Sequence, residues 1–278
     1  MNVMQELCAL RRADAEKRAR TCPLADLERQ IASLPPAKDF AAAFEAGRGP
    51  RVIAELKKAS PSKGLIRADF RPADLAAELV AAGAAALSIL CEPHKFLGNE
   101  DYIRIVRGET PVPVLYKDFV TTPYQVAAAR AAGADAVLLI VAALSQESLA
   151  SLLACARGYG LQALVETHTA EEMSVAVSAG ARIIGVNCRD LKTFHTDPAI
   201  TAGLIRQLPQ ETVKIAESGI RTREDIDSLA AAGANGFLIG ETIMRAEHPG
   251  GALCALVAGG HASGFSEAPV EALPTNLA

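Results

Sequence analysis

Residues Ala131-Ala-Gly-Ala-Asp-Ala-Val-Leu-Leu-Ile140 join the end of an alanine-rich segment to a run of five apolar residues. The glycine at this junction is typical of a helix end, because that position often needs a positive φ angle, which glycine adopts without steric cost. A similar junction occurs at 81–84, 178–181 and 231–234, at a spacing of roughly 50 residues. The sequence therefore predicts a repeated unit in which a helix is followed by a buried strand.

Further apolar runs fall between these junctions, and helix-start signals precede the intervening segments. The signals are Thr122-Pro123, Asp197-Pro198, Thr169 with Glu172 three residues later, and Thr222 with Asp225. Fully apolar strands that alternate with amphipathic helices indicate parallel strands covered by helices, and eight such units predict a closed (β/α)8 TIM barrel. An open doubly wound sheet is the alternative, but the chain has no GxGxxG turn. The predicted strands are 52–56, 86–90, 112–115, 136–140, 161–165, 182–186, 213–216 and 236–239.

Three regions follow from this pattern. Residues 1–47 do not share the repeat and predict an N-terminal helical extension, with helices at 3–20 and 24–34 and a short third at 40–46. Residues 48–258 form the barrel. Residues 259–278 are rich in Gly, Ser, Pro and Ala, so we expect a flexible tail without a catalytic role.

Composition excludes several classes of protein. The formal net charge is −4 and the basic residues are scattered, which argues against a nucleic-acid partner. No apolar run approaches the ~20 residues of a membrane span. The six cysteines lie far apart without a CxxC pair, so we expect reduced thiols in a cytoplasmic protein and no metal site. The oligomeric state stays open, and a monomer is compatible with the sequence.

Charged residues follow almost every predicted strand, at the end where barrel enzymes carry their active sites. Glu55 and Lys57 alternate at the end of the first strand, so their side chains point to one face. Burying an acid and a base is costly unless they pair or serve a ligand. A site for an anionic substrate is the favoured interpretation, and a solvated ion pair at an exposed strand end is the alternative.

Lys117 and Glu166, after the third and fifth strands, are the best candidates for a general acid/base pair. A structural ion pair with Glu55 or Glu217 is the alternative for each of them. His168 precedes the next helix, and we expect a loop residue near the mouth, with a general base as the alternative.

Two glycine turns follow the seventh and eighth strands, where barrels of this type hold phosphate groups. They are Ser218-Gly219 and Gly240-Glu241-Thr242. Glycine lets the backbone approach an anion, and N–H groups at a helix start can bind it. Tight turns without a ligand are the alternative.

Five segments of the chain resemble the indole-3-glycerol phosphate synthase family, and the resemblance extends from about residue 7 to about residue 256. The segments are Ile53-Ala-Glu-Leu-Lys-Lys-Ala-Ser-Pro-Ser62, Lys117-Asp-Phe119, Asn187-Cys-Arg-Asp-Leu191, Glu217-Ser-Gly-Ile220 and Gly240-Glu-Thr-Ile-Met244. The resemblance implies a carboxy-lyase of tryptophan biosynthesis. Such an enzyme closes the ring of 1-(2-carboxyphenylamino)-1-deoxyribulose 5-phosphate, then removes carbon dioxide and water, without a metal or organic cofactor.

The resemblance also implies roles for individual residues. Lys117 corresponds to the general acid, Glu166 stabilises charge at the anilino nitrogen, and Glu55 with Lys57 act in dehydration. Asn187 and Glu217 orient hydroxyl groups. The implied substrate-binding residues are Ser60, Phe96, Phe119, Ile140, Arg189, Leu191, Ser218, Gly219, Gly240 and Glu241.

The sequence gives less support to two other functions. A phosphoribosylanthranilate isomerase-like enzyme pairs a cysteine on strand one with an aspartate on strand seven, where this chain has Glu55 with Lys57 and Glu217. A barrel that has lost catalysis and acts as a scaffold would not need all four of Glu55, Lys57, Lys117 and Glu166.

Overall fold

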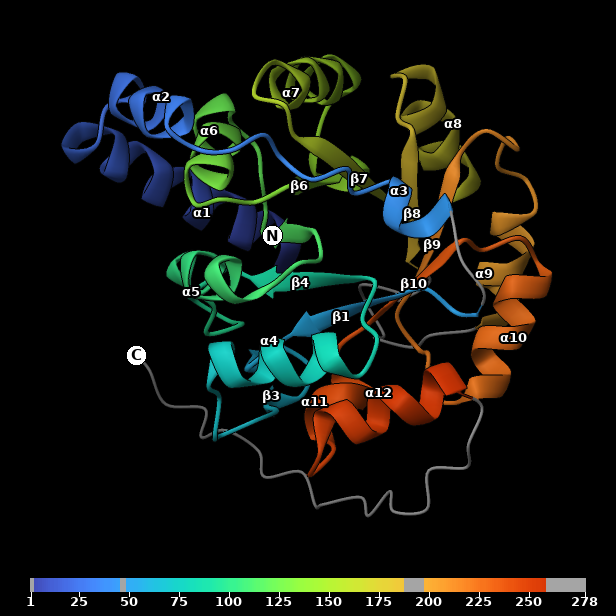
Figure 1. Ribbon diagram of the computed structural model, residues 1–278. Helices are drawn as coiled ribbons and strands as arrows, with labels where there is room; N and C mark the ends of the chain where they lie inside the picture. Colours follow the sequence, from blue (N-terminus) through green and yellow to red (C-terminus); the bar gives the residue numbers. More distant parts are fainter. Residues whose placement is uncertain (1–2, 46–48, 188–197, 259–278) are drawn as a thin grey trace.

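Eight parallel strands close into a barrel in the computed structural model, which describes residues 3–45, 49–187 and 198–258 (Figure 1). Around the barrel the strand order is β1, β10, β9, β8, β7, β6, β5, β4, and β4 pairs with β1. The predicted (β/α)8 fold is confirmed. The strands are β1 (Val52–Leu56), β4 (Ala86–Leu90), β5 (Val114–Lys117), β6 (Ala136–Ile140), β7 (Gln162–Thr167), β8 (Ile183–Asn187), β9 (Val213–Glu217) and β10 (Gly236–Ile239).

Several strands extend further than their apolar residues predicted. The prediction ended them at the first polar residue, but the parallel pairing continues to Lys117 opposite Leu90 and to Asn187 opposite Glu217. The charged side chains therefore stand on the last strand residues, and not on loops. β5 also begins two residues later than the predicted start at Val112.

The helices surround the barrel, and the four predicted glycine stops have positive φ angles between 79° and 104° at Gly83, Gly133, Gly180 and Gly233. Two short strands, β2 (Ala59–Ser60) and β3 (Gly64–Leu65), form a hairpin after β1 that the sequence did not predict. The helices are α4 (Pro72–Ala81), α5 (Asp101–Glu109), α6 (Pro123–Ala131), α7 (Gln146–Gly158), α8 (Ala170–Ser178), α9 (Pro198–Ile205), α10 (Arg223–Ala231), α11 (Glu241–Arg245) and α12 (Pro249–Ala258), and a 3-10 turn, η1, spans Val141–Ala143.

The helix caps agree with the sequence in part. Complete capping boxes form at Thr122 and Thr222. At Thr169 only half of the box forms, because the carboxylate of Glu172 accepts a hydrogen bond from the backbone N–H of His168 instead of that of Thr169. Asp197 lies outside the described residues.

The N-terminal extension is helical, as predicted, with α1 (Val3–Thr21), α2 (Leu24–Ala32) and α3 (Ala42–Glu45). Figure 1 shows α1 and α2 lying beside α6, and Leu27 of α2 packs on an alanine face of α6. The chain then crosses to the amino end of the barrel. There Phe40 and Phe44 join the apolar residues of the barrel interior, so the extension closes that end.

The apolar core has two layers. One fills the barrel interior, and the other lies between the strands and the surrounding helices. Among the described helices, none combines the length and the hydrophobicity that crossing a membrane requires. The fold therefore leaves the carboxyl ends of the strands as the place where polar side chains gather.

Candidate active site

Glu55 and Lys57 form the first part of a charged cluster at the carboxyl end of the barrel. Lys57 donates a hydrogen bond of 2.5 Å from Nζ to Oε2 of Glu55, whose side chain is buried. A Cβ atom at Gly240 would lie 2.2 Å from the same Oε2, so Glu55 occupies the space that a side chain there would fill. Burial by itself would raise the pKa of Glu55, but the ammonium groups of Lys57 and Lys117 lower it below its ordinary value.

Lys117 forms the second part. Its Nζ atom donates a hydrogen bond of 3.2 Å to Oε2 of Glu166 and lies 4.0 Å from Oε2 of Glu217. Burial would lower the pKa of Lys117, but Glu166, Glu217 and Glu55 raise it above its ordinary value. Since Glu55 interacts with both lysines, the two parts are one cluster, as the sequence predicted. The raised pKa of Lys117 favours its protonated form, which has a proton to donate.

The glutamates Glu166 and Glu217 have opposite protonation preferences. Burial raises the pKa of Glu166, but Lys117 and then His168 lower it below the ordinary value. Burial raises the pKa of Glu217 well above the ordinary value, and the neighbouring carboxylate of Glu166 adds to the shift. The two carboxyl groups on either side of Lys117 therefore have pKa values shifted in opposite directions, an arrangement suited to proton transfer.

Gly185 is a site residue that the sequence analysis missed. It pairs with Glu166 in the sheet, and a Cβ atom on it would lie 2.0 Å from Oε1 of Glu217. Glu217 therefore leans over a glycine of the neighbouring strand. An isolated glycine within an apolar strand often marks such a close approach, and this signal was present in Ile183-Ile-Gly-Val-Asn187.

An apolar wall lies beside the charges. The rings of Phe96 and Phe119 are 6.2 Å apart with an interplanar angle of 43°. Phe119 packs against the interior layer that includes Ile140. The buried carboxylate of Glu92, another residue that the sequence analysis missed, accepts hydrogen bonds from the backbone N–H groups of residues 94, 95 and 96 and so fixes the loop that carries Phe96.

The two glycine turns differ in conformation. Ser218 and Gly219 have φ angles of 66° and 74°, and a left-handed serine indicates backbone strain of the kind found at binding sites. Glu241 begins α11 and lies 3.7 Å from Nζ of Lys63, which follows the short β2 strand. The hydroxyl of Ser60 on β2 is buried without a hydrogen-bond partner among the described residues.

Not every predicted residue can be placed. Asn187 ends β8 and pairs with Glu217 in the sheet, so it stands at the cluster. Arg189 and Leu191 lie outside the described residues. His168 was expected to be a loop residue near the mouth. It follows the last residue of β7 and lies between two carboxylates, those of Glu166 and Glu172.

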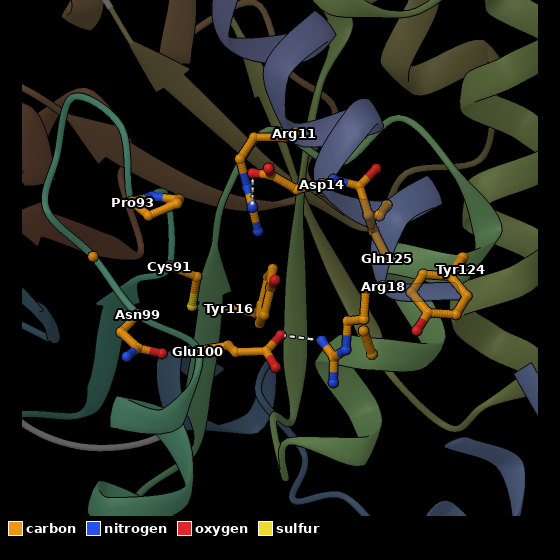
Figure 2. A pocket seen from close by; sticks show the side chains of 13 residues that line it. Arg11, Asp14, Arg18, Cys91, Pro93, Asn99, Glu100, Tyr116, Tyr124 and Gln125 are labelled. Carbon is orange, nitrogen blue, oxygen red and sulfur yellow. Dashed lines mark hydrogen bonds and ion pairs between the residues drawn. The ribbon is translucent and has the colours of Figure 1, made fainter. Parts of the chain in front are cut away.

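A cavity of about 280 Å³ lies outside the barrel wall and contains none of the predicted site residues. Figure 2 shows the cavity between α1, the loop after β4 and α6. Two ion pairs, Arg11 with Asp14 and Arg18 with Glu100, line it. The charged cluster is therefore separate from this cavity. Within the described residues, no group of His, Cys, Asp and Glu side chains is arranged to hold a metal ion.

The fold and this cluster define a barrel enzyme with acid–base groups at the carboxyl ends of its strands. The family model described as indole-3-glycerol phosphate synthase matches residues 4–256. The chain belongs to the indole-3-glycerol phosphate synthase family.

Relatives that carry this name agree with the assignment. The protein of Acidithiobacillus ferrooxidans is 45% identical over 255 residues, which cover 91% of this chain and 97% of that one. The protein of Rhodospirillum rubrum is 44% identical and the match covers 92% and 99%. The protein of Micrococcus luteus is 46% identical and the match covers 91% and 96%.

Solved structures with low sequence identity show the fold alone. The 3-hexulose-6-phosphate synthase of Salmonella typhimurium matches with a TM-score of 0.61 at 15% identity, over 76% of this chain and 100% of that one. The N-acetylmannosamine-6-phosphate 2-epimerase of Clostridium perfringens matches with a TM-score of 0.59 at 15% identity, over 77% and 94%.

Proposed function

We propose that this chain is an indole-3-glycerol phosphate synthase, a carboxy-lyase that converts 1-(2-carboxyphenylamino)-1-deoxyribulose 5-phosphate into indole-3-glycerol phosphate in tryptophan biosynthesis. Family membership supports the reaction. The single structural observation that carries it is Lys117 between Glu166 and Glu217, with the Lys57–Glu55 pair beside them. This arrangement provides charged groups for each proton transfer that the reaction requires.

Ring closure needs an acid at the substrate carbonyl. The ring carbon that bears the carboxylate attacks the carbonyl carbon, and Lys117 donates a proton to the carbonyl oxygen as it becomes a hydroxyl group. Positive charge then develops on the anilino nitrogen. Glu166, whose carboxylate is kept ionised by Lys117 and His168, stabilises that charge.

The later steps remove carbon dioxide and then water. Loss of carbon dioxide returns the bonding electrons to the ring system and neutralises the anilino nitrogen. In dehydration the hydroxyl group leaves with a proton, while a base removes a proton from the neighbouring carbon. Lys57 is the proposed acid for the leaving hydroxyl group, and Glu55, whose pKa is lowered by Lys57 and Lys117 and which accepts a 2.5 Å hydrogen bond from Lys57, is the proposed base.

The remaining residues bind the substrate. The anthranilate ring packs against Phe96, Phe119 and Ile140. Arg189 is the proposed partner of its carboxylate, and Leu191 belongs to the same set of proposed substrate-binding residues. Asn187 and the protonated Glu217 orient the sugar hydroxyl groups. The phosphate group binds the backbone of the two glycine turns, and the unpartnered Ser60 hydroxyl supplies a further donor. The residues proposed to bind the phosphate group are Ser60, Ser218, Gly219, Gly240 and Glu241.

We further propose that the chain acts in the cytoplasm and as a monomer. The described cysteines Cys8, Cys22, Cys91, Cys155 and Cys254 are free thiols, which suits a reducing compartment. All described members of the charged cluster come from one chain, so a single copy supplies the acid–base groups.

The test is turnover of the carboxyphenylamino substrate by the purified chain, followed by indole fluorescence and by released carbon dioxide. We expect one molecule of carbon dioxide to be released for each molecule of indole product formed. Binding of phosphate ligands without either product would favour the scaffold alternative.

A further inference from the structure

His168 makes contacts that the proposed catalytic steps do not use. Its Nδ1 atom lies 3.1 Å from Oε2 of Glu172, and its Nε2 atom lies 3.4 Å from Oε1 of Glu166. The Nδ1 atom is within hydrogen-bond distance of Glu172, whereas the buried Nε2 atom makes no hydrogen bond among the described residues and approaches Glu166 only as an ion-pair contact. An imidazolium ring places its positive charge between the two carboxylates. The imidazole is therefore a charged link between α8 and the catalytic Glu166.

The ring is also fixed in place by the backbone. The carboxylate of Glu172 accepts a 2.7 Å hydrogen bond from the backbone N–H of His168, in addition to the contact with Nδ1. The same glutamate lies in the first turn of α8, where its backbone N–H donates to the side-chain hydroxyl of the cap residue Thr169. In a complete capping box the Glu172 side chain would accept a hydrogen bond from the backbone N–H of Thr169. Here it accepts from His168 instead and so fixes that residue.

Among the residues that the structure describes, the charges around the ring come from a small set of elements. Glu166 on β7 and Glu172 on α8 contact it, and Lys117, Glu217 and Glu55 lie beyond Glu166 in the cluster. The neighbouring residues 136–143 of β6 and η1 are apolar, and β8 contributes no ionisable side chain. Burial lowers the pKa of His168, but Glu166 and Glu172 raise it to about 10.

We propose that His168 is a positioning residue for the reaction: held by Glu172, it keeps the Glu166 carboxylate oriented toward Lys117 and ionised. One oxygen of Glu166 faces His168 while the other accepts from Lys117, so the carboxylate is held from both sides. Without the imidazolium, Glu166 loses one of the two cations that lower its pKa, and only Lys117 remains. Its neighbour Glu217 has a raised pKa and so does not supply a compensating charge. This inference rests on the proposed function.

The consequence concerns pH. Glu166 can stabilise the charge on the anilino nitrogen only as an anion. Removal of His168 raises the pKa of Glu166, so the acid limb of the kcat/KM profile moves to higher pH. A residue with a merely structural role would lower activity equally at each pH.

The experiment compares His168→Gln, Glu172→Gln and the wild type in kcat/KM profiles from about pH 3 to about pH 9, so that the acid limb of Glu166 falls within the range. His168→Gln keeps a polar side chain of similar length but has no charge. We expect kcat to fall on the order of tenfold, with an acid limb displaced upward, and a smaller displacement in the same direction for Glu172→Gln. His248→Gln is the control, because His248 is an exposed residue that does not belong to the cluster.

A second readout does not depend on turnover. In the ¹⁵N spectrum of histidine side chains, with His168 assigned by its loss in His168→Gln, the ring should remain an imidazolium to about pH 9. Titration near the ordinary histidine value of about 6.5, or an unchanged pH profile in His168→Gln, would overturn the proposal. A wild type that shows the persistent imidazolium but no turnover would instead contradict the proposed function.

Discussion

Arg11, on the N-terminal helix α1, reaches the carboxylate of Asp118 with contacts of 2.7 to 3.0 Å, and Asp118 stands between Lys117 and Phe119. The same carboxylate accepts hydrogen bonds from the hydroxyl of Tyr116 and from the backbone N–H of Phe119. The extension thus contacts the chain at the point where the proposed acid and the apolar wall meet. It closes the amino end of the barrel and supports the carboxyl end.

Replacing Arg11 is expected to destabilise the protein and to impair the site. In Arg11→Ala the fully buried Asp118 carboxylate loses its cation, which for a buried pair costs about 3 kcal/mol. Urea unfolding measures the loss, and kcat should fall with it. The control is Arg29→Ala, which removes an ion pair with Asp26 on the exposed face of α2 and should cost less than about 1 kcal/mol. Equal losses of unfolding free energy in Arg11→Ala and Arg29→Ala would contradict the conclusion that Arg11 supports the carboxyl end of the barrel.

Lys117→Ala tests the general acid directly. We expect kcat to fall on the order of 10²-fold or more, because no other proton donor replaces the ammonium group at the carbonyl oxygen. Steady-state turnover measured by indole fluorescence decides the result. Lys17→Ala, at an exposed position of α1, should keep the wild-type rate. A near-normal rate in Lys117→Ala would move the role to another residue, with Lys57 as the first candidate.

Gly185→Ala should damage the site through its geometry alone. The added methyl group would meet Oε1 of Glu217 at 2.0 Å, so the carboxyl group would have to change its position relative to Glu166 and Lys117. We expect kcat/KM to fall on the order of 10²-fold, as for a small misplacement of a catalytic group. Gly203→Ala is the matched control, since nothing lies within 4 Å of a Cβ atom there and alanine should stabilise α9 by up to about 1 kcal/mol. Full activity in Gly185→Ala would show that the position of Glu217 is unimportant.

Glu217→Gln should separate stability from activity. The folded state raises the pKa of Glu217, so the protein gains stability from its bound proton only at low pH. As the pH rises above the ordinary glutamate value of about 4.3, the unfolded chain releases the proton first and the folded state becomes relatively less stable. Glutamine, which is neutral at every pH, avoids that loss.

Thermal unfolding at two pH values measures this effect. Tm of Glu217→Gln should exceed that of the wild type at about pH 8 by about 2 °C or more, and the difference should shrink toward about pH 4. Activity should fall, because the proposed hydroxyl-orienting acid is gone. A Tm difference that grows as the pH falls would show that Glu217 is ionised in the folded protein.

The sequence by itself determined the repeated unit and the chemical character of the strand ends. Four glycine junctions and the apolar runs after them predict parallel strands and their number, because a helix stop and a buried strand are encoded by neighbouring residues. The same local reasoning identified Glu55, Lys57, Lys117 and Glu166 as charged residues at strand ends. It did not reach Gly185, Glu92 or the contact of Glu172 with the backbone of His168.

Only the tertiary structure decided how these groups share protons. Glu166 and Glu217 are the same residue type, but their pKa values shift in opposite directions: Lys117 and His168 lower the pKa of Glu166, whereas burial and the neighbouring Glu166 carboxylate raise that of Glu217. Closure of the barrel brings strands that are distant in the chain to within a few ångströms, so burial and charge act together on each side chain. The sequence identifies the titratable groups, but their burial and the distances between them set the direction in which each pKa shifts.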